Sequence, residues 1–231
     1  TLPAVIYASG TKKWVKNGHP HREDKDENGN TLPAIIYANG TKKWYKNGEL
    51  HRDDKEQLCC SADPAERDLK DENGYTLPAE IWDDGTKIWY KNGQVHRDDK
   101  DENGYTLPAI IYADGSKKWY KNDKLHREDK DSEGNTLPAE ICVDGSKHWY
   151  KDGRLHREDK DSEGRTLPAV ILANGAKYWY KNGYLHREDK DSEGNTLPAV
   201  IFDGTKRWFV DGNEVAKETQ PEQAPKQAPM D

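Results

Sequence analysis

Acidic side chains recur in short loops at a spacing that suits a hard cation. Oxygen-bearing residues stand at the first, third and fifth positions before a glycine, and the pattern appears five times. Calcium takes six to eight oxygen ligands, and glycine permits the sharp bend that gathers them. The residues predicted to bind calcium are Asp24, Asp26 and Asn28; Asp99, Asp101 and Asn103; Asp129, Asp131 and Glu133; Asp159, Asp161 and Glu163; and Asp189, Asp191 and Glu193.

The same spacing matches only the first half of an EF-hand loop, whose twelfth position supplies a closing bidentate carboxylate. A single copy offers a carboxylate there, because the twelfth positions are Ile35, Ile110, Glu140, Val170 and Val200. A solvated acidic turn accounts for these residues without a cation, and the sequence favours it. Both interpretations stay open, and calcium is the one cofactor that the sequence suggests.

A histidine recurs after the second turn of each complete unit, which raises the question of a transition-metal site. Each of these histidines has nearly the same neighbours, whereas a metal site needs different ligands that converge on one point. We therefore expect packed or ion-paired structural histidines. The set is His21, His51, His96, His126, His156 and His186.

No pattern in the chain predicts catalysis. A nucleophile with a positioned base, a glycine-rich phosphate loop and a zinc signature are all missing from the sequence. Near-identical units also offer few unique places for an active site. We therefore expect that the protein is not an enzyme.

The three cysteines are Cys59, Cys60 and Cys142, and an odd number of cysteines gives no disulfide framework. Cys142 replaces an aromatic residue or leucine at its repeat position, which favours a small apolar role. Cys59 and Cys60 lie in the 15-residue insert at 56–70, the one element that breaks the repeat. We predict that this pair makes a specific contact or crosslink in an assembly.

All of these residues sit on a repeated scaffold. The segment Thr-Leu-Pro-Ala-x-Ile occurs seven times, and five of the six intervals between copies are 30 residues while one is 45. A fixed period of this size is typical of elongated proteins whose units bury an apolar face against their neighbours. The copies begin at Thr1, Thr31, Thr76, Thr106, Thr136, Thr166 and Thr196.

Each unit has the pattern of a β-hairpin or meander. In residues 31–60, Ala34–Tyr37 and Lys42–Lys46 are strand candidates separated by the turn signal Asn39-Gly40, and a second Asn-Gly leads to a short third strand. We predict an all-β, elongated repeat domain over 1–215, in which seven units form a twisted sheet or solenoid. The Pro/Gln-rich segment 216–231 reads as a tail or linker.

Differences among the copies predict which face is buried. One strand position is always isoleucine, from Ile6 to Ile201, whereas the position before it accepts Glu80 and Glu140. We expect the invariant isoleucines to be buried and the position that accepts glutamate to face water, following the period of two in a half-buried strand. A tryptophan column should anchor the core: Trp14, Trp44, Trp89, Trp119, Trp149, Trp179 and Trp208.

Two motifs carry a resemblance to a known family. The segments Asn-Gly-x-Leu-His-Arg-Glu-Asp and Pro-Ala-x-Ile-Tyr-Ala-Asn-Gly-Thr-Lys-x-Trp-Tyr resemble the MORN-like repeat variant of bacterial and phage proteins, over residues 1 to about 215. Here the acidic segment at 25–32 and its equivalents intervene between the two motifs. The resemblance implies a β-meander that mediates binding or scaffolding, and some relatives resemble antitoxin components or cell-surface and virion proteins.

Composition limits the classes of function. The chain is 32% hydrophobic and 34% charged, but its eight Trp and twelve Tyr favour a folded protein over disorder. Its net charge of −7 comes from mixed signs, so we expect no nucleic-acid footprint. No apolar run is long enough for a membrane span.

The repeats favour two kinds of function. The first is a structural or adhesive protein that self-assembles in an extracellular appendage, filament or virion, because strand edges at both ends can pair. We place that contact in the first repeat (Ala4 to Trp14) and the last (Ala199 to Trp208). The second is a soluble antitoxin-like or scaffold protein, in the cytoplasm, that holds a partner on one sheet face.

Overall fold

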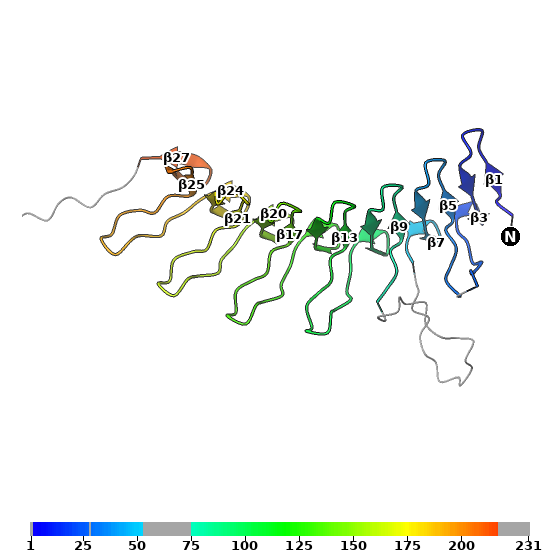
Figure 1. Ribbon diagram of the computed structural model, residues 1–231, viewed down its shortest axis with the longest axis horizontal. Coiled ribbons are helices and arrows are strands. Elements are labelled where there is room, and N and C mark those ends of the chain that lie inside the picture. The colour runs from blue at the N-terminus through cyan, green and yellow to red at the C-terminus, as the bar shows by residue number, and fades with distance from the viewer. Residues whose placement is uncertain (1, 28, 53–74, 217–231) are drawn as a thin grey trace, which may run out of the picture.

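The protein is an elongated ladder of β-hairpins. The computed structural model describes residues 2–27, 29–52 and 75–216, and within those ranges it holds strands and no helix. Fifteen strands form one antiparallel sheet along the whole length of the ladder. Long loops between repeats hang from one side of this sheet, and short turns close its hairpins on the other (Figure 1). The predicted all-β, elongated repeat fold is therefore confirmed.

Each of the first six repeats contributes one pair of strands to the main sheet, and the last repeat contributes three strands. In order along the sheet these are β1 (Val5–Ile6), β2 (Lys12–Lys13), β5 (Ile35–Ile36), β6 (Lys42–Lys43), β9 (Glu80–Ile81), β10 (Lys87–Ile88), β13 (Ile110–Ile111), β14 (Lys117–Lys118), β17 (Glu140–Ile141), β18 (Lys147–His148), β21 (Val170–Ile171), β22 (Lys177–Tyr178), β25 (Val200–Phe202), β26 (Thr205–Val210) and β27 (Asn213–Val215).

A second, smaller hairpin follows each pair in the first six repeats. These hairpins are β3 (Val15–Lys16) with β4 (His19–Pro20), β7 (Tyr45–Lys46) with β8 (Glu49–Leu50), β11 (Tyr90–Lys91) with β12 (Gln94–Val95), β15 (Tyr120–Lys121) with β16 (Lys124–Leu125), β19 (Tyr150–Lys151) with β20 (Arg154–Leu155), and β23 (Tyr180–Lys181) with β24 (Tyr184–Leu185).

The turns of the small hairpins explain the Asn-Gly signal. Asn92 and Gly93 both have positive φ, of 51° and 75°. A two-residue turn with positive φ at both positions is the type that matches the right-handed twist of its strands. Asparagine tolerates this region and glycine occupies it freely, so the local sequence sets the hairpin register.

The tryptophan column is buried as predicted. The rings from Trp14 to Trp179 are only 5–7% exposed. Trp119 illustrates the arrangement, because its indole Nε1 donates a 2.6 Å hydrogen bond to the Thr106 carbonyl and the Arg127 guanidinium lies 4.1 Å from its ring centroid. Trp208, in the last repeat, is only half-buried. In the first six repeats, each ring of the column thus contacts the arginine that lies later in the same repeat.

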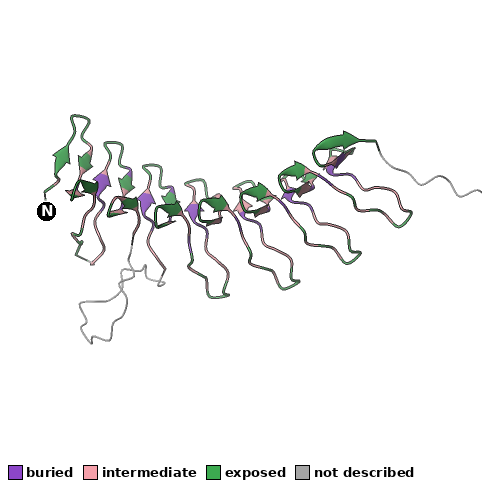
Figure 2. Cartoon of the chain, turned by 180° about the vertical axis from the view of Figure 1, so that it is seen from behind, coloured by how far each residue is buried: buried purple, intermediate pink, exposed green. Residues whose placement is uncertain are grey.

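The prediction about the two strand positions was wrong. Glu80 is 5% exposed, and Ile110 at the equivalent position is also buried, whereas the invariant Ile81 and Ile111 are half-buried. Figure 2 shows the buried positions following the sheet along its length. Glu80 tolerates burial because Lys43 Nζ lies 2.9 Å from its carboxylate and Trp82 Nε1 donates to it at 2.7 Å. A buried charge is acceptable when it is paired and hydrogen-bonded.

Candidate functional site

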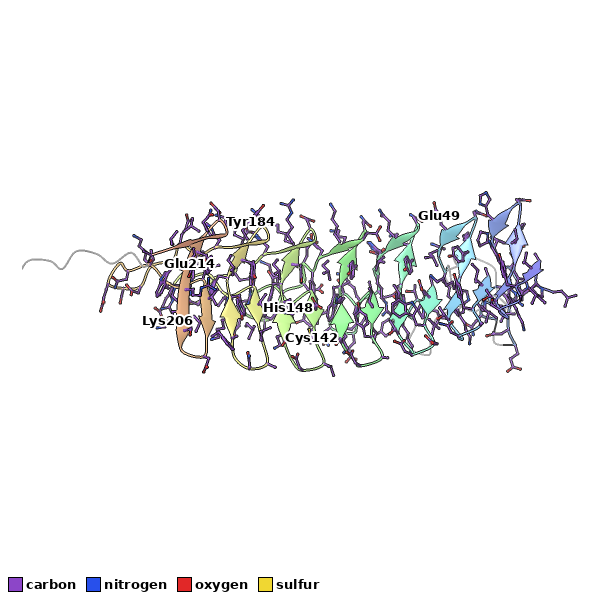
Figure 3. All side chains as sticks on the ribbon, turned by 90° about the horizontal axis from the view of Figure 1, so that it is seen from above. Glu49, Cys142, His148, Tyr184, Lys206 and Glu214 are labelled. Atoms are coloured by element: carbon purple, nitrogen blue, oxygen red, sulfur yellow. The ribbon has the colours of Figure 1, made fainter. Side chains whose placement is uncertain are left out.

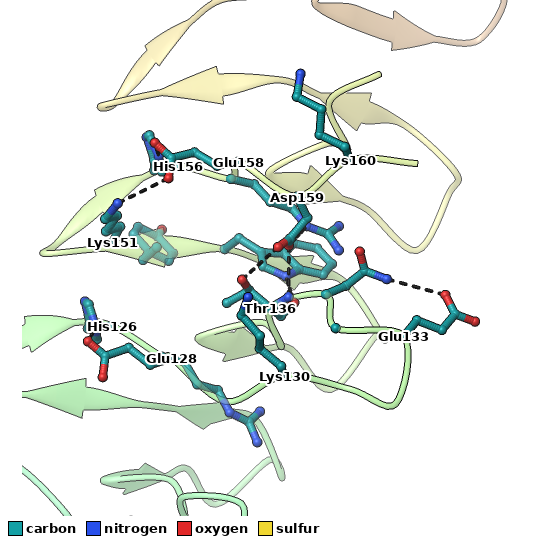
Figure 4. A pocket seen from close by; sticks show the side chains of 16 residues that line it. His126, Glu128, Lys130, Glu133, Thr136, Lys151, His156, Glu158, Asp159 and Lys160 are labelled. Carbon is teal, nitrogen blue, oxygen red and sulfur yellow. Dashed lines mark hydrogen bonds and ion pairs between the residues drawn. The ribbon is translucent and has the colours of Figure 1, made fainter. Parts of the chain in front are cut away.

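The first aspartate of each acidic loop joins neighbouring repeats. Asp159 Oδ2 accepts hydrogen bonds from Arg157 Nε at 2.8 Å and the Thr136 backbone N–H at 3.0 Å, while Oδ1 accepts from Thr136 Oγ1 at 2.9 Å (Figure 4). Both carboxylate oxygens therefore have partners in the protein. Equivalent bonds join Asp99 to Arg97 and Thr76, Asp129 to Arg127 and Thr106, and Asp189 to Arg187 and Thr166; Asp24 pairs with Arg22.

The second aspartate of each loop shapes its own turn. Asp131 Oδ1 accepts hydrogen bonds from the backbone N–H groups of Glu133 and Asn135 at 3.0 and 2.9 Å. Short polar side chains that bond to backbone groups two to four residues on are typical of Asx turns. Asp101, Asp161 and Asp191 make the same bonds, and Asp26 accepts from the Asn30 N–H.

The third residue of each loop faces solvent. Glu133, Glu163 and Glu193 are exposed, as is Asn103. In the described part of the chain, the carboxylates of one loop do not form a group of three potential ligands within 4.8 Å. The predicted convergence of ligands on one point is therefore not seen in loops 129–133 and 159–163, because the first aspartate bonds to the preceding repeat while the second bonds within its own loop. Calcium binding by the acidic loops stays a prediction.

Three of the predicted residues lie outside the described residues. These are Asn28 in the first acidic loop, and Cys59 and Cys60 in the insert at 56–70. The predicted role of the cysteine pair in assembly stays a prediction.

The histidine column links repeats as well. His126 is 9% exposed, its Nε2 lies 2.9 Å from Glu128, and its Nδ1 accepts a 3.1 Å hydrogen bond from the Asp152 backbone N–H in the next repeat. His96, His156 and His186 accept the same backbone hydrogen bond. The prediction of packed, ion-paired structural histidines is thus confirmed.

Open grooves separate neighbouring rows of these side chains on one face of the ladder. One groove, of about 600 Å³, lies between repeats 106–135 and 136–165. It is lined by groups of both signs, among them Lys130 and Lys160, and by Lys151, whose Nζ lies 3.3 Å from Glu158 (Figure 4). Two smaller grooves repeat this lining one unit to either side. Such grooves suit a polar partner with regularly spaced charges better than a small apolar ligand.

Each end of the ladder leaves a strand edge open in the described chain. β1 pairs with β2 alone. In β26, residues 205–207 pair only with β25, whereas residues 208–210 pair with the last strand, β27. Val5 is 40% exposed, whereas its equivalent Ile110 is 7% exposed, and Ala4 is exposed where Ala109 is fully buried. The ends therefore lack the cover that every interior repeat receives from its neighbour.

The sequence analysis did not predict one cluster of potential metal ligands. Glu140, Cys142 and His148 bring a carboxylate oxygen, a sulfur and an imidazole nitrogen within 4.8 Å of one another. The signal is present in the sequence, because three positions of one hairpin change type together, but the predictions above treat Glu140 and Cys142 separately and do not include His148.

No protein-family model matches the chain, and no curated protein matches it in sequence. The resemblance to MORN-like repeats therefore rests on the two motifs alone. None of the described residues forms a helix with the length and apolar character needed to cross a membrane.

Proposed function

We propose that this chain is a non-enzymatic structural repeat protein that associates end to end, as a component of an extracellular appendage, filament or virion. The observation that carries the proposal is the equivalence between the open edges at the two ends and the strands that meet inside the ladder. A resemblance to MORN-like repeats supports a binding or scaffolding role.

An interior junction defines what such an end-to-end contact would be. β22 pairs with β25 in the register Lys177 to Ile201 and Tyr178 to Val200. The Trp179 backbone N–H donates a 2.9 Å hydrogen bond to the Ala199 carbonyl, and Ala199 is fully buried. Backbone hydrogen bonds and small buried side chains thus hold one repeat against the next.

The two ends of the ladder present strands that are equivalent to those at the interior junction. Lys206 and Arg207 on β26 stand where Lys177 and Tyr178 stand on β22, and Ile6 and Val5 on β1 stand where Ile201 and Val200 stand on β25. Pairing of β26 with β1 of a second copy would cover the exposed Ala4 and Val5 and the half-buried Trp208. A head-to-tail contact of this kind does not close on itself and extends into a filament.

The test is the mass of the chain as a function of concentration. We expect sedimentation velocity to show growth above the monomer mass, and negative-stain images to show filaments. Val5→Lys should raise the dissociation constant at least about tenfold, because it places a charge at the position where Ile35, Ile110 and Val170 bury an apolar side chain. Val143→Lys is the matched control, since Val143 is 66% exposed and far from both ends.

A monomer at all concentrations, or equal association of Val5→Lys and the parent chain, would contradict the proposal. Two further variants test the predicted contributions of the insert and the tail. Replacement of Cys59 and Cys60 by serine, and deletion of residues 216–231, should each weaken association.

The second candidate is an antitoxin-like or scaffold protein that holds a protein partner on its grooved face. The three equivalent mixed-charge grooves favour it. A small heteromer of fixed mass in the native source, weakened by Glu128→Lys and Glu158→Lys together, would support this function over the filament. Those substitutions should leave end-to-end association unchanged.

A further inference from the structure

One hairpin differs from all others at three positions at once. The β17–β18 hairpin carries a glutamate, a cysteine and a histidine where its neighbours carry aliphatic, aromatic or lysine side chains. The equivalents one repeat earlier are Ile110, Tyr112 and Lys118, and one repeat later they are Val170, Leu172 and Tyr178. The Glu80 hairpin shares only the carboxylate, since Trp82 and Ile88 occupy the other two positions.

The strand geometry brings the three side chains to one place. Glu140 and His148 are directly opposite each other in the antiparallel pair of β17 and β18. Cys142 follows Glu140 by two residues and so lies on the same face of the sheet. Their donor atoms all lie within 4.8 Å of one another, and Figure 3 places Cys142 and His148 on this hairpin.

The local contacts direct the imidazole and the carboxylate at each other. His148 Nδ1 is buried and lies 3.4 Å from Glu140 Oε2. Lys118 Nζ lies 3.2 Å from the other carboxylate oxygen, Oε1. Lys118 can therefore hold the carboxylate in place through Oε1, as outer-shell partners of metal ligands do, while Oε2 stays directed at the cluster.

We propose that Glu140, Cys142 and His148 bind a zinc ion. Thiolate, imidazole and carboxylate together are ligands that zinc takes, whereas calcium and magnesium prefer oxygen alone. Bond lengths of about 2.0–2.3 Å place the donors of a tetrahedral site roughly 3.3–3.8 Å apart, so small side-chain rotations close this site. Three protein ligands leave the fourth position open to solvent or a partner group.

A nucleophilic role for the cysteine fits this environment less well. Burial, together with the charge of Glu140, raises the pKa of the Cys142 thiol. Reactive cysteines instead have a lowered thiol pKa. A zinc ion would remove the thiol proton on binding, as metals do at cysteine ligands.

The experiment uses the full chain with Cys59→Ser and Cys60→Ser, so that Cys142 is the one remaining thiol. Cobalt(II) serves as a spectroscopic substitute for zinc. We expect one equivalent of cobalt to produce a thiolate-to-metal charge-transfer band, and one equivalent of zinc to abolish it. The band should be lost in Cys142→Leu, which installs the residue of the next repeat.

Substitutions taken from the neighbouring hairpins test the other two ligands in chains that should still fold. Zinc affinity should fall by more than about tenfold in Glu140→Val and in His148→Tyr, since removal of an outer-shell partner already costs that much. Circular dichroism without metal shows whether each variant is folded. Absence of a thiolate band in the single-thiol chain, or unchanged zinc affinity in either folded variant, would overturn the proposal.

Discussion

In the acidic loops that the structure describes, an arginine joins the core to the loop. The Arg127 guanidinium lies over Trp119, and its Nε donates a 2.8 Å hydrogen bond to Asp129. Burial lowers the pKa of Arg127 although Asp129 opposes the shift. An arginine stays charged after such a shift, so it provides both a cation–π contact and a charge-assisted hydrogen bond.

Removal of one tryptophan should open a cavity in a thin core. Trp119→Ala should lower the free energy of unfolding by about 3–5 kcal/mol, because the ring is 6% exposed and its hydrogen bond to Thr106 is also lost. Urea denaturation measures this change. Val143→Ala, at an exposed position, should change stability by less than about 0.5 kcal/mol. Equal effects of the two substitutions would contradict a tryptophan-based core.

Stability should fall in acid because of the aspartates that join repeats. Burial opposes ionisation of Asp159, but hydrogen bonds from Arg157 and Thr136 outweigh it and hold the pKa of the carboxyl below its usual value of 3.8; Asp189 behaves alike. The unfolded chain therefore takes up protons first as pH falls, which favours unfolding.

We expect the urea midpoint to decrease as the pH falls toward and below 3.8, the ordinary pKa of an aspartate. The decrease should continue until the pH passes the lower pKa that Asp159 has in the folded state. Asp159→Asn should show a shallower decrease, since one of the linked carboxyls is gone. A urea midpoint that rises as the pH falls through this range would show that other titratable groups control the pH dependence of stability.

Residue-level burial was the weakest part of the sequence interpretation. Tolerance of glutamate at positions 80 and 140 was taken to indicate contact with water. The structure buries Glu80 because Lys43, Trp82 and Tyr90 are all within bonding distance. Lys43 comes from the neighbouring strand β6 and Tyr90 from the small hairpin β11–β12, and a pattern along a single strand cannot reveal these two partners.

At the scale of the elements, each acidic loop is a turn that its own side chain closes. The backbone groups of Asp131 bond to those of Gly134 and Asn135, and the isolated bridge between Lys130 and Thr136 completes the loop. The carboxylate adds hydrogen bonds to two further N–H groups. This network explains, without a bound cation, why the same order of residue types is repeated in the five loops of this chain.

Two substitutions of Asp131 separate the turn from the calcium hypothesis. Asp131→Asn keeps the acceptor oxygen and should preserve the melting temperature, whereas Asp131→Ala loses it and should cost about 0.5–1.5 kcal/mol. We expect the parent chain to have the same melting temperature in excess chelator and in excess calcium. A higher melting temperature in calcium, with a smaller increase in Asp131→Asn, would instead support calcium binding by the loop.

The hairpins themselves could be predicted, and the reason is local. Asn-Gly and Asp-Gly need no distant partner to adopt positive φ, so the turns were correctly located. The joining of hairpins into one sheet was less visible, since the strands of most repeats are only two residues long. Their pairing depends on backbone bonds across repeats, such as that from Trp119 N–H to the Ala139 carbonyl.

For the whole molecule, contacts between adjacent repeats carry the architecture. The main sheet adds its strands in chain order, and the side-chain links from aspartate to threonine span a single repeat boundary. Stability should then approximate a sum of repeats and nearest-neighbour interfaces.

Deletion of one complete repeat should leave a folded, shorter ladder. Removal of residues 166–195 joins Arg165 to Thr196 and lets β18 pair with β25, so that His148 meets Val200 in place of Val170. Small-angle X-ray scattering should show a length smaller by about 10 Å, the width of two strands. Loss of the β signal in circular dichroism would contradict independence of the repeats.

The direction of the strands determines how this chain would respond to tension. Hydrogen bonds between neighbouring strands run along the ladder, so a pull on the two ends loads one strand pair at a time. A repeat of 30 residues occupies about 10 Å when folded and extends to roughly 100 Å when drawn out. Stepwise opening would let the chain lengthen severalfold while its remaining repeats stay folded.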